Sequence, residues 1–365
     1  MRDRRRVVAT LAIYSAVILL GLAFALRAVP GTLAGALRSG DAPRTAVPAN
    51  GAMTVEFPMG ATAEQIVVQL EKTGVIHDGR ALRALLDLGG LTAKLQAGRY
   101  RFTTDMPPAE VARLLGNGPT RPKTVTLREG LRSEEIGDLL IKEGVVTADA
   151  WDAALTAPRN APFLASRPEG ASLLGYLMPA TYAFDDTTTA DGLVQSMLDA
   201  FGRQVTPEII AAGKERGMTL HQLVTLASIV EREAGAAAER PTIAAVFINR
   251  LVQQIPLQAD PTVQFAVSRV PGNVERFGYW KGQLTNADLA LESPYNTYLN
   301  RGLPPGPITN PGLASIQAVV KPAPVNYLYF VASPACDGTH LFSATLAEHN
   351  ANVEKFAKSA CAKGN

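Results

Sequence analysis

Two glutamates, Glu231 and Glu233, stand two positions apart near the end of a predicted helix. Two residues of an α-helix span about 200° around its axis, so the two carboxylates lie on either side of an apolar stripe centred near Val230 and Ala234. Each therefore borders the core, where burial raises the pKa of a carboxyl group toward a value that suits a general acid. Helical geometry does not choose between them, and surface ion pairs with Arg232 or Arg240 are the alternative.

The chain has few of the cysteine and histidine residues that metal and redox sites use. The chain of 365 residues has two cysteines, Cys336 and Cys361, and four histidines that form no His-x-x-x-His pair. This composition excludes a disulfide-rich scaffold and a cysteine-based zinc cage, and we predict neither a metal nor a cofactor. A net charge of +2, spread along the chain, argues against nucleic acid as a partner, which clustered Lys and Arg would indicate. The two cysteines are either joined in a disulfide or left as thiols.

An apolar segment at the start of the chain predicts a membrane anchor. Val7 to Leu26 carry no charge, and at 1.5 Å per residue they reach about 30 Å, the thickness of a bilayer's hydrocarbon core. Arginines crowd residues 1–6, so we expect a cytoplasmic tail, an inner (plasma) membrane helix at 7–26 and everything beyond it outside the cytoplasm. A cleaved signal peptide is the alternative. Residues 27–52 are rich in Pro, Gly and Ala and predict a linker.

An internal repeat follows the linker. At an offset of 70 residues, 54–57 and Gly60 match 124–127 and Gly130, and the similarity continues through the next 16 residues. Each copy predicts a strand, a glycine turn and two helices. In the first copy the strand 97–102 is expected to pair back with 55–57, followed by a helix at 108–115. Residues 53–118 thereby resemble LysM-type glycan-binding modules, with a plain spacer as the alternative, and 119–170 form a second repeat or connector.

Longer elements predict a larger α+β domain from residue 171 to 360. The capping-box pattern at 219–222 opens the helix that carries the two glutamates, and Arg240-Pro241 opens another helix to Leu251. The stretch 258–312, dense in Pro, Gly and Asn, is too long for an ordinary loop and predicts a functional surface. The chain ends with strands at 327–332 and 340–343 and a helix at 347–358.

Eight segments in this order resemble the endolytic murein transglycosylases, or YceG-like proteins. They are 226–233, 239–240, 245–251, 257–263, 294–298, 302–308, 310–312 and 327–332. The resemblance covers the anchor, the LysM-like region and the α+β catalytic domain. In that family the second glutamate of the Glu-x-Glu pair is the catalytic acid, which carries over to Glu233. The chain departs from the family where it has Leu174, Ala180 and Ala234, in place of two acids and a hydroxyl residue.

The resemblance implies cleavage of the MurNAc–GlcNAc bond in nascent peptidoglycan strands. The 6-hydroxyl of the same sugar closes a 1,6-anhydro ring, so one acid–base glutamate suffices where ordinary glycosidases need two carboxylates. Glu231, Arg240 and Asn249 are expected to support Glu233. Polar residues of the loop region are expected to hold the glycan: Gln258, Asp260, Thr262, Tyr295, Asn296 and Tyr298. Loop architecture is the alternative for these residues, with Asp260 capping a helix and Asn296 forming an Asx turn.

The expected product is a strand whose elongation has been terminated. Expected partners are peptidoglycan glycan strands, the inner membrane and, as a further candidate, a peptidoglycan synthase. Two other functions remain open: a hydrolytic muramidase that uses water, and a non-catalytic glycan-binding scaffold of the wall-synthesis machinery.

Overall fold

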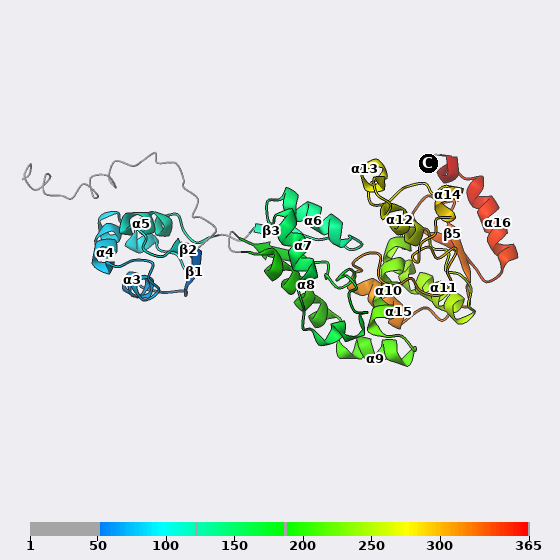
Figure 1. The fold of residues 1–365 in the computed structure, drawn as a ribbon, viewed down its shortest axis with the longest axis horizontal. Helices are drawn as coiled ribbons and strands as arrows, with labels where there is room; N and C mark the ends of the chain where they lie inside the picture. Colours follow the sequence, from blue (N-terminus) through cyan, green and yellow to red (C-terminus); the bar gives the residue numbers. More distant parts are fainter. Residues whose placement is uncertain (1–51, 121–122, 186–187, 364–365) are drawn as a thin grey trace, which may run out of the picture. The chain divides into compact units, whose positions relative to one another are not determined.

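The computed structural model describes residues 52–120, 123–185 and 188–363 (Figure 1). The predicted tail, anchor and linker lie outside these residues. Within the described part of the chain, no helix combines the length and the apolar character needed to cross a bilayer. The fold is mixed α+β, as predicted: helices predominate, and the strands form three separate two-stranded antiparallel sheets.

The chain divides into two compact units, Met1–Arg121 and Pro122–Asn365. The first unit ends close to the predicted limit of the LysM-like segment at residue 118. The predicted division between 170 and 171 coincides with no boundary between units, because the second repeat shares one hydrophobic core with the predicted catalytic region.

The first unit is a strand–helix–helix–strand arrangement followed by a helix. Its elements are β1 (Ala52–Phe57), α3 (Ala63–Lys72), α4 (Gly79–Leu88), β2 (Gly98–Thr103) and α5 (Pro108–Gly116). The predicted pairing of the two strands is confirmed, with Val55 opposite Tyr100 and Phe57 opposite Gly98. Phe57, Tyr100 and Phe102 are buried on one face of this hairpin and pack against one another, so the unit has its own core.

The second repeat has the same arrangement, including a return strand that the sequence repeat does not reveal. It comprises β3 (Lys123–Thr126), α6 (Ser133–Lys142), α7 (Ala148–Thr156), β4 (Thr181–Phe184) and α8 (Ala190–Gln204). Val125 pairs with Tyr182 as Val55 pairs with Tyr100. The hydroxyls of Tyr100 and Tyr182 each donate to the carbonyl four residues earlier. The two copies therefore share their strand pairing and this tyrosine hydrogen bond.

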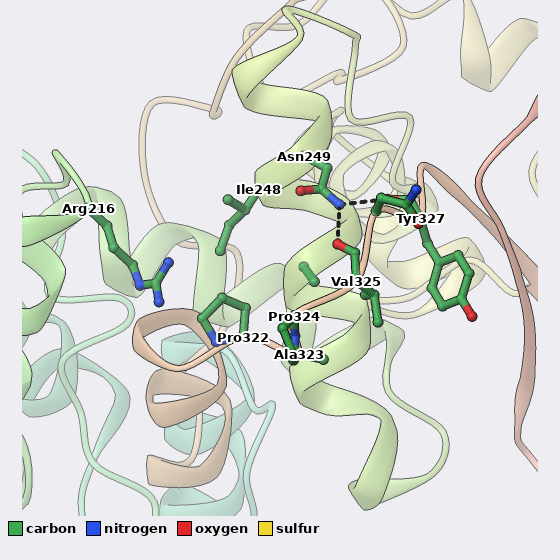
Figure 2. Close-up of a pocket in the computed structure, with 10 residues that line it drawn as sticks. Arg216, Ile248, Asn249, Pro322, Ala323, Pro324, Val325 and Tyr327 are labelled. Atoms are coloured by element: carbon green, nitrogen blue, oxygen red, sulfur yellow. Dashed lines mark hydrogen bonds between the residues drawn. The ribbon is translucent and has the colours of Figure 1, made fainter.

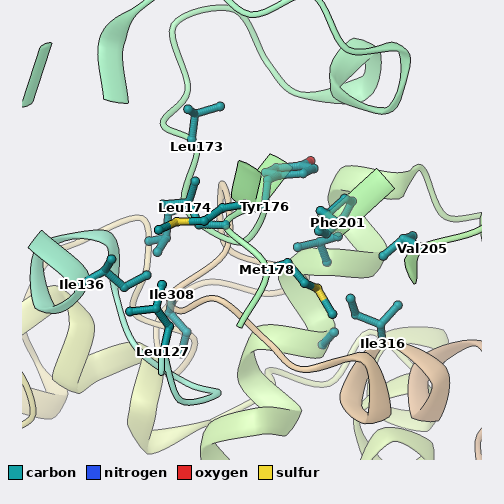
Figure 3. Close-up of a cluster of buried hydrophobic side chains, with 14 of the residues drawn as sticks. Leu127, Ile136, Leu173, Leu174, Tyr176, Met178, Phe201, Val205, Ile308 and Ile316 are labelled. Carbon is teal, nitrogen blue, oxygen red and sulfur yellow. The ribbon is translucent and has the colours of Figure 1, made fainter. Parts of the chain in front are cut away.

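Other elements of the second unit precede or follow α10 (Leu220–Glu233; Figure 1), whose residues from Leu223 to Val230 are buried. They are α9 (Pro207–Glu215), α11 (Arg240–Val252), α12 (Asp260–Ser268), α13 (Asn273–Phe277), α14 (Asn286–Leu289), α15 (Leu313–Val320), β5 (Tyr329–Ala332), β6 (His340–Ser343), α16 (Leu346–Ala357) and α17 (Ala360–Lys363). Helices α11, α12 and α15 pack against α10. Figure 3 shows Leu127 and Ile136 of the second repeat beside Ile308 in this core.

Local signals place most of these elements where the sequence predicts them. Thr219 and Gln222 form the predicted capping box at the start of α10, and Pro241 lies in the first turn of α11. The long polar stretch is the exception, because residues 258–312 contain α12, α13 and α14 and are not a single loop. Asp260 is the first residue of α12, but it does not cap the helix as the loop alternative expected, because Ala259 takes the N-cap position and no side chain caps this end.

Candidate active site

The two glutamates at the end of α10 differ sharply in their surroundings. The Glu231 side chain is 5% exposed and its carboxylate has three donors. Arg240 Nη2 donates at 3.1 Å, the Gly312 backbone N–H at 2.9 Å and Ser315 Oγ at 2.8 Å. These bonds tie α10 to α11 and to the start of α15, so Glu231 is a structural residue.

Glu233 ends α10 and is half-buried. Among the described residues its carboxylate has neither a hydrogen-bond donor nor an ion-pair partner. Burial, with the Asp260 carboxylate as the next cause, raises the pKa of Glu233 to about 8, although the positive charges of Arg232 and Arg250 act in the opposite direction. Glu233 therefore holds its proton at neutral pH and has a hydrogen-bonding position left for a substrate.

Asp260 is the second carboxylate of the site. It is exposed, and it accepts a hydrogen bond of 2.6 Å from the Tyr298 hydroxyl. Burial and the charges of Asp260 and Glu233 raise the pKa of Tyr298, so this hydroxyl stays protonated and donates. Gln258 is also exposed, and its side-chain oxygen accepts from Arg250 Nη1 at 3.3 Å. Of these groups, Asp260 and Arg250 act on Glu233 through their charges, which shift its pKa in opposite directions.

A cavity of about 560 Å³ opens on Glu233. Its wall is formed by the end of α10, the end of β5 and the turn that leads into β6, and it includes Arg232, Gly235, Ser333, Thr339, His340 and Phe356. Cys336 and Cys361 line it as well and are joined in a disulfide, which settles the alternatives that the sequence left open. In the part of the chain that the structure describes, no three His, Cys, Asp or Glu side chains group as metal ligands would.

The model of the YceG-like family matches residues 55–355. The chain belongs to the YceG-like family. It is 32% identical over 321 residues to an endolytic murein transglycosylase of Bacillus subtilis, covering 84% of this chain and 85% of that protein. A protein of the same name from Streptococcus pneumoniae is 29% identical over 84% of this chain, which spans 59% of that protein.

A solved structure supports the same family. The crystal structure of a putative YceG-like protein from Listeria monocytogenes is 30% identical and covers 82% of this chain and 98% of its own, with a TM-score of 0.54. The resemblance that the eight sequence segments suggested is thus confirmed at the level of the family.

Two residues expected to contact substrate in this YceG-like chain are instead buried. Thr262 is fully buried, and its hydroxyl bonds to the Ala259 carbonyl and to Thr297. Asn296 is also fully buried: its amide donates to the carbonyls of Leu289 and Leu291, while its oxygen accepts from the Tyr298 N–H in the Asx turn foreseen as the alternative. Both side chains have their polar atoms satisfied by the protein, so they shape the loop that presents Tyr298.

Tyr295 is half-buried, with its ring 4.7 Å from that of Phe265, and burial raises the pKa of its hydroxyl. Leu174 and Ala180, where the sequence resemblance implied acids, pack in or against the core. Ala234 lines the cavity beside Glu233.

Two of the predicted supporting residues, Arg240 and Asn249, form hydrogen bonds to Glu231 and to main-chain carbonyls respectively, and not to Glu233. Arg240 bonds to Glu231 and Ser315 and lies 3.5 Å from Glu129. Asn249 donates at 3.0 Å to the carbonyls of Val325 and Tyr327, in the wall of a separate cavity of about 600 Å³ (Figure 2). Asn249 therefore anchors the segment that leads into β5.

Two arginines lower the pKa of Glu233 through their charge, and sequence reasoning missed Arg250 and considered Arg232 only as a surface ion-pair partner. Arg250 is buried and donates to the Leu328 and Leu257 carbonyls. Its position four residues after Val246, on the apolar face of α11, is a signal that could have identified it. The Arg232 guanidinium lies 3.9 Å from the centre of the Trp280 ring. No spacing in the sequence connects residues 232 and 280.

Proposed function

We propose that this protein is a lytic transglycosylase that cleaves peptidoglycan glycan strands internally, with Glu233 as its single acid–base residue. The observation that carries the proposal is the contrast at the end of α10: Glu231 is held by three donors, whereas Glu233 has none and its pKa is raised to about 8. Membership in the YceG-like family, and the name that the two curated relatives share, support the substrate.

The proposed reaction needs no water and no second acid. The Glu233 carboxyl protonates the oxygen of the MurNAc–GlcNAc bond, the bond from that oxygen to the anomeric carbon breaks, and positive charge develops on the sugar. The 6-hydroxyl of the same MurNAc then attacks the anomeric carbon, and the Glu233 carboxylate accepts its proton. The products are a 1,6-anhydro end and a new GlcNAc 4-hydroxyl, and Glu233 is protonated again. Asp260, whose charge raises the pKa of Glu233, supplies negative potential toward the cationic sugar.

Glu233→Gln and Glu231→Gln together test the assignment. We expect Glu233→Gln to lower the cleavage rate of purified sacculi by about 10³-fold or more, since the amide cannot transfer a proton. Glu231→Gln should lower stability, because the Arg240 guanidinium loses its buried charged partner, but should retain cleavage in the folded fraction. Wild-type activity in Glu233→Gln, or no activity in wild type under any condition, would favour the non-catalytic scaffold.

A hydrolytic muramidase is the second candidate, because Asp260 provides a second carboxylate near Glu233 that could activate water. Mass spectrometry of the released glycans separates the two reactions. Anhydro ends are expected for the transglycosylase; reducing ends, heavier by one water, would identify the hydrolase.

We further propose that residues 7–26 anchor the enzyme in the inner membrane with the N-terminus in the cytoplasm. The disulfide between Cys336 and Cys361 supports an oxidising compartment for the second unit. An anchored enzyme reaches only strands close to the membrane, where a peptidoglycan synthase releases them, so cleavage there would terminate elongation. Protease added to spheroplasts should degrade the second unit while a cytoplasmic marker stays intact; protection of the second unit would contradict this orientation.

A further inference from the structure

Together with the end of α10, the turn between β5 and β6 forms part of the wall of the cavity beside Glu233, and this turn is held in place by several contacts. The turn lies directly on the end of the catalytic helix: a Cβ atom on Gly235 would come within 2.4 Å of the Gly338 carbonyl oxygen. Gly338 itself has φ +76°, a conformation that side chains rarely adopt. The disulfide ties the same turn, at Cys336, to Cys361 in α17. The turn is thus fixed both to α10 and to the C-terminal helices.

His340 is the best-oriented polar side chain in this wall. Glu239 holds it twice: one carboxylate oxygen accepts from the His340 backbone N–H at 3.0 Å, and the other lies 2.8 Å from Nδ1. The ring packs against Phe330 and Phe342, and the side chain is 14% exposed. Among the described residues, Nε2 has no hydrogen-bond partner. A carboxylate on Nδ1 fixes the orientation of an imidazole and leaves Nε2 for a ligand.

We propose that this cavity is the subsite for one N-acetylhexosamine adjoining the cleaved bond, with His340 Nε2 as its hydrogen-bonding contact and the disulfide as the clamp that keeps the wall in place. The inference rests on the proposed function. Because Glu233 lines this cavity and must touch the glycosidic oxygen, the cavity receives a sugar bonded to that oxygen. Ser333 and Thr339 add hydroxyls to the wall, and Phe356 adds apolar surface for an acetyl methyl group.

Binding measured in the uncleaving Glu233→Gln background tests the subsite. The probe is a peptide-free tetrasaccharide of alternating GlcNAc and MurNAc, titrated by calorimetry. Ala332 is exposed and lines the cavity, so Ala332→Trp should fill it and weaken binding at least tenfold. Ala335 is exposed on the same turn outside the cavity lining, so Ala335→Trp is the matched control and should leave the dissociation constant unchanged.

A second pair of variants tests the contact itself. His340→Ala should weaken tetrasaccharide binding about tenfold, and His340→Gln, whose amide can reach the position of Nε2, should recover part of that loss. Lys358→Ala, at an exposed side chain of the second unit that does not line the cavity, is the control. In the otherwise wild-type enzyme, His340→Ala should raise KM more than it lowers kcat. Reduction of the disulfide should raise KM in the same direction.

The outcomes separate this inference from the proposed function. Unchanged tetrasaccharide binding in both Ala332→Trp and His340→Ala, with wild-type circular dichroism, would overturn the subsite even if Glu233→Gln abolishes cleavage. Binding of an isolated stem peptide that Ala332→Trp abolishes, without loss of tetrasaccharide binding, would assign the cavity to peptide and also overturn it. Cleavage by Glu233→Gln at the wild-type rate would instead refute the catalytic assignment.

Discussion

The two copies of the repeat share a fold but differ in what their first turn contacts. In the first copy, the turn between β1 and α3 is exposed, with Met59 at 95% exposure. In the second copy, the corresponding turn between β3 and α6 is built into the proposed active-site unit: the Gly130 N–H donates to the Asn310 carbonyl at 2.9 Å, and Glu129 lies 3.5 Å from Arg240.

The residue at the start of the first helix also differs between the copies: it is Thr62 before α3 and Arg132 before α6. Thr62 caps α3 with its own hydroxyl, a purely local hydrogen bond to Gln65. Arg132 takes the equivalent position in the second copy, and its guanidinium lies 4.0 Å from the centre of the Trp280 ring. The Arg232 guanidinium lies 3.9 Å from the centre of the Trp280 ring, so both guanidinium groups pack against this indole. The first copy forms a unit of its own, whereas the second copy supports the Glu233 helix through these arginine–tryptophan contacts.

Replacing the two equivalent residues should give the largest contrast. Arg132 is 1% exposed, so Arg132→Ala leaves a cavity and an unpaired Tyr279 carbonyl and should cost about 3 kcal/mol or more. Thr62→Ala removes a helix cap and should cost about 1 kcal/mol. Both tryptophans, Trp151 and Trp280, lie in the second unit, so urea denaturation followed by tryptophan fluorescence reports that unit.

The fluorescence midpoint should therefore fall for Arg132→Ala and stay unchanged for Thr62→Ala. Equal midpoints for the two variants would mean that the second copy does not depend on the Arg132 stack.

The pH dependence of cleavage tests whether Arg232, which packs on the same tryptophan as Arg132 of the second copy, controls the pKa of Glu233. Cleavage requires the protonated carboxyl, so the rate should fall as the pH rises through the Glu233 pKa, near 8. The Arg232 charge lowers that pKa; Arg232→Gln should therefore raise it and move the alkaline limb of kcat/KM to higher pH, by about half a unit to one unit. Arg269, which forms an ion pair with Glu134 of the second copy and is not among the charges that shift the Glu233 pKa, is the control. A limb that moves equally in Arg269→Gln would refute a specific role for Arg232.

The sequence predicts the local elements well because their signals are local. The capping box at Thr219, the proline of α11 and the pairing of Val55 with the 97–102 strand each depend on a few neighbouring residues. The second return strand was missed because 57 positions separate Val125 from Tyr182, whereas 45 separate Val55 from Tyr100, so the fixed offset of 70 fails there. Insertions between elements defeat a comparison at constant spacing.

The candidate site was harder to predict because residue type does not reveal burial. Thr262 and Asn296 are polar residues in a polar stretch, yet both are fully buried with their side chains satisfied by main chain and neighbours. Glu231 and Glu233 border the core equally in a helical projection, and only the approach of Arg240, Gly312 and Ser315 distinguishes them. The mismatch between Thr62 and Arg132 was visible in the repeat, but its partner Trp280 is 148 positions further along the chain.

A smaller difference in stability is expected between substitutions in the first turn of each copy, at Glu129 and at Met59. Burial, followed by repulsion from Glu231, raises the pKa of Glu129, so its ionisation destabilises the folded state as the pH rises above the ordinary glutamate range. Glu129→Gln removes that pH-dependent loss and should stabilise the second unit at pH 7, by less than about 1 kcal/mol because the side chain is 46% exposed. The gain should vanish near pH 4, where the wild-type carboxyl is protonated. Met59→Gln, at the equivalent exposed position, should change nothing; a gain that persists at pH 4 would contradict the electrostatic cause.

Removing the first copy should have the smallest effect on the second unit. The hydrophobic core of the first unit contains no residue of the second unit's core, so deletion of residues 52–120 leaves the core around the Glu233 helix complete. The tryptophan unfolding midpoint should therefore stay within about 0.5 kcal/mol of the full chain, the scale expected for changes outside a cooperative unit. Cleavage of a soluble tetrasaccharide should also be unchanged. If the first copy binds glycan, as its resemblance to LysM-type modules suggests, the deletion should lower activity on intact sacculi alone, whereas an equal loss on both substrates would show that the first copy acts on the active site itself.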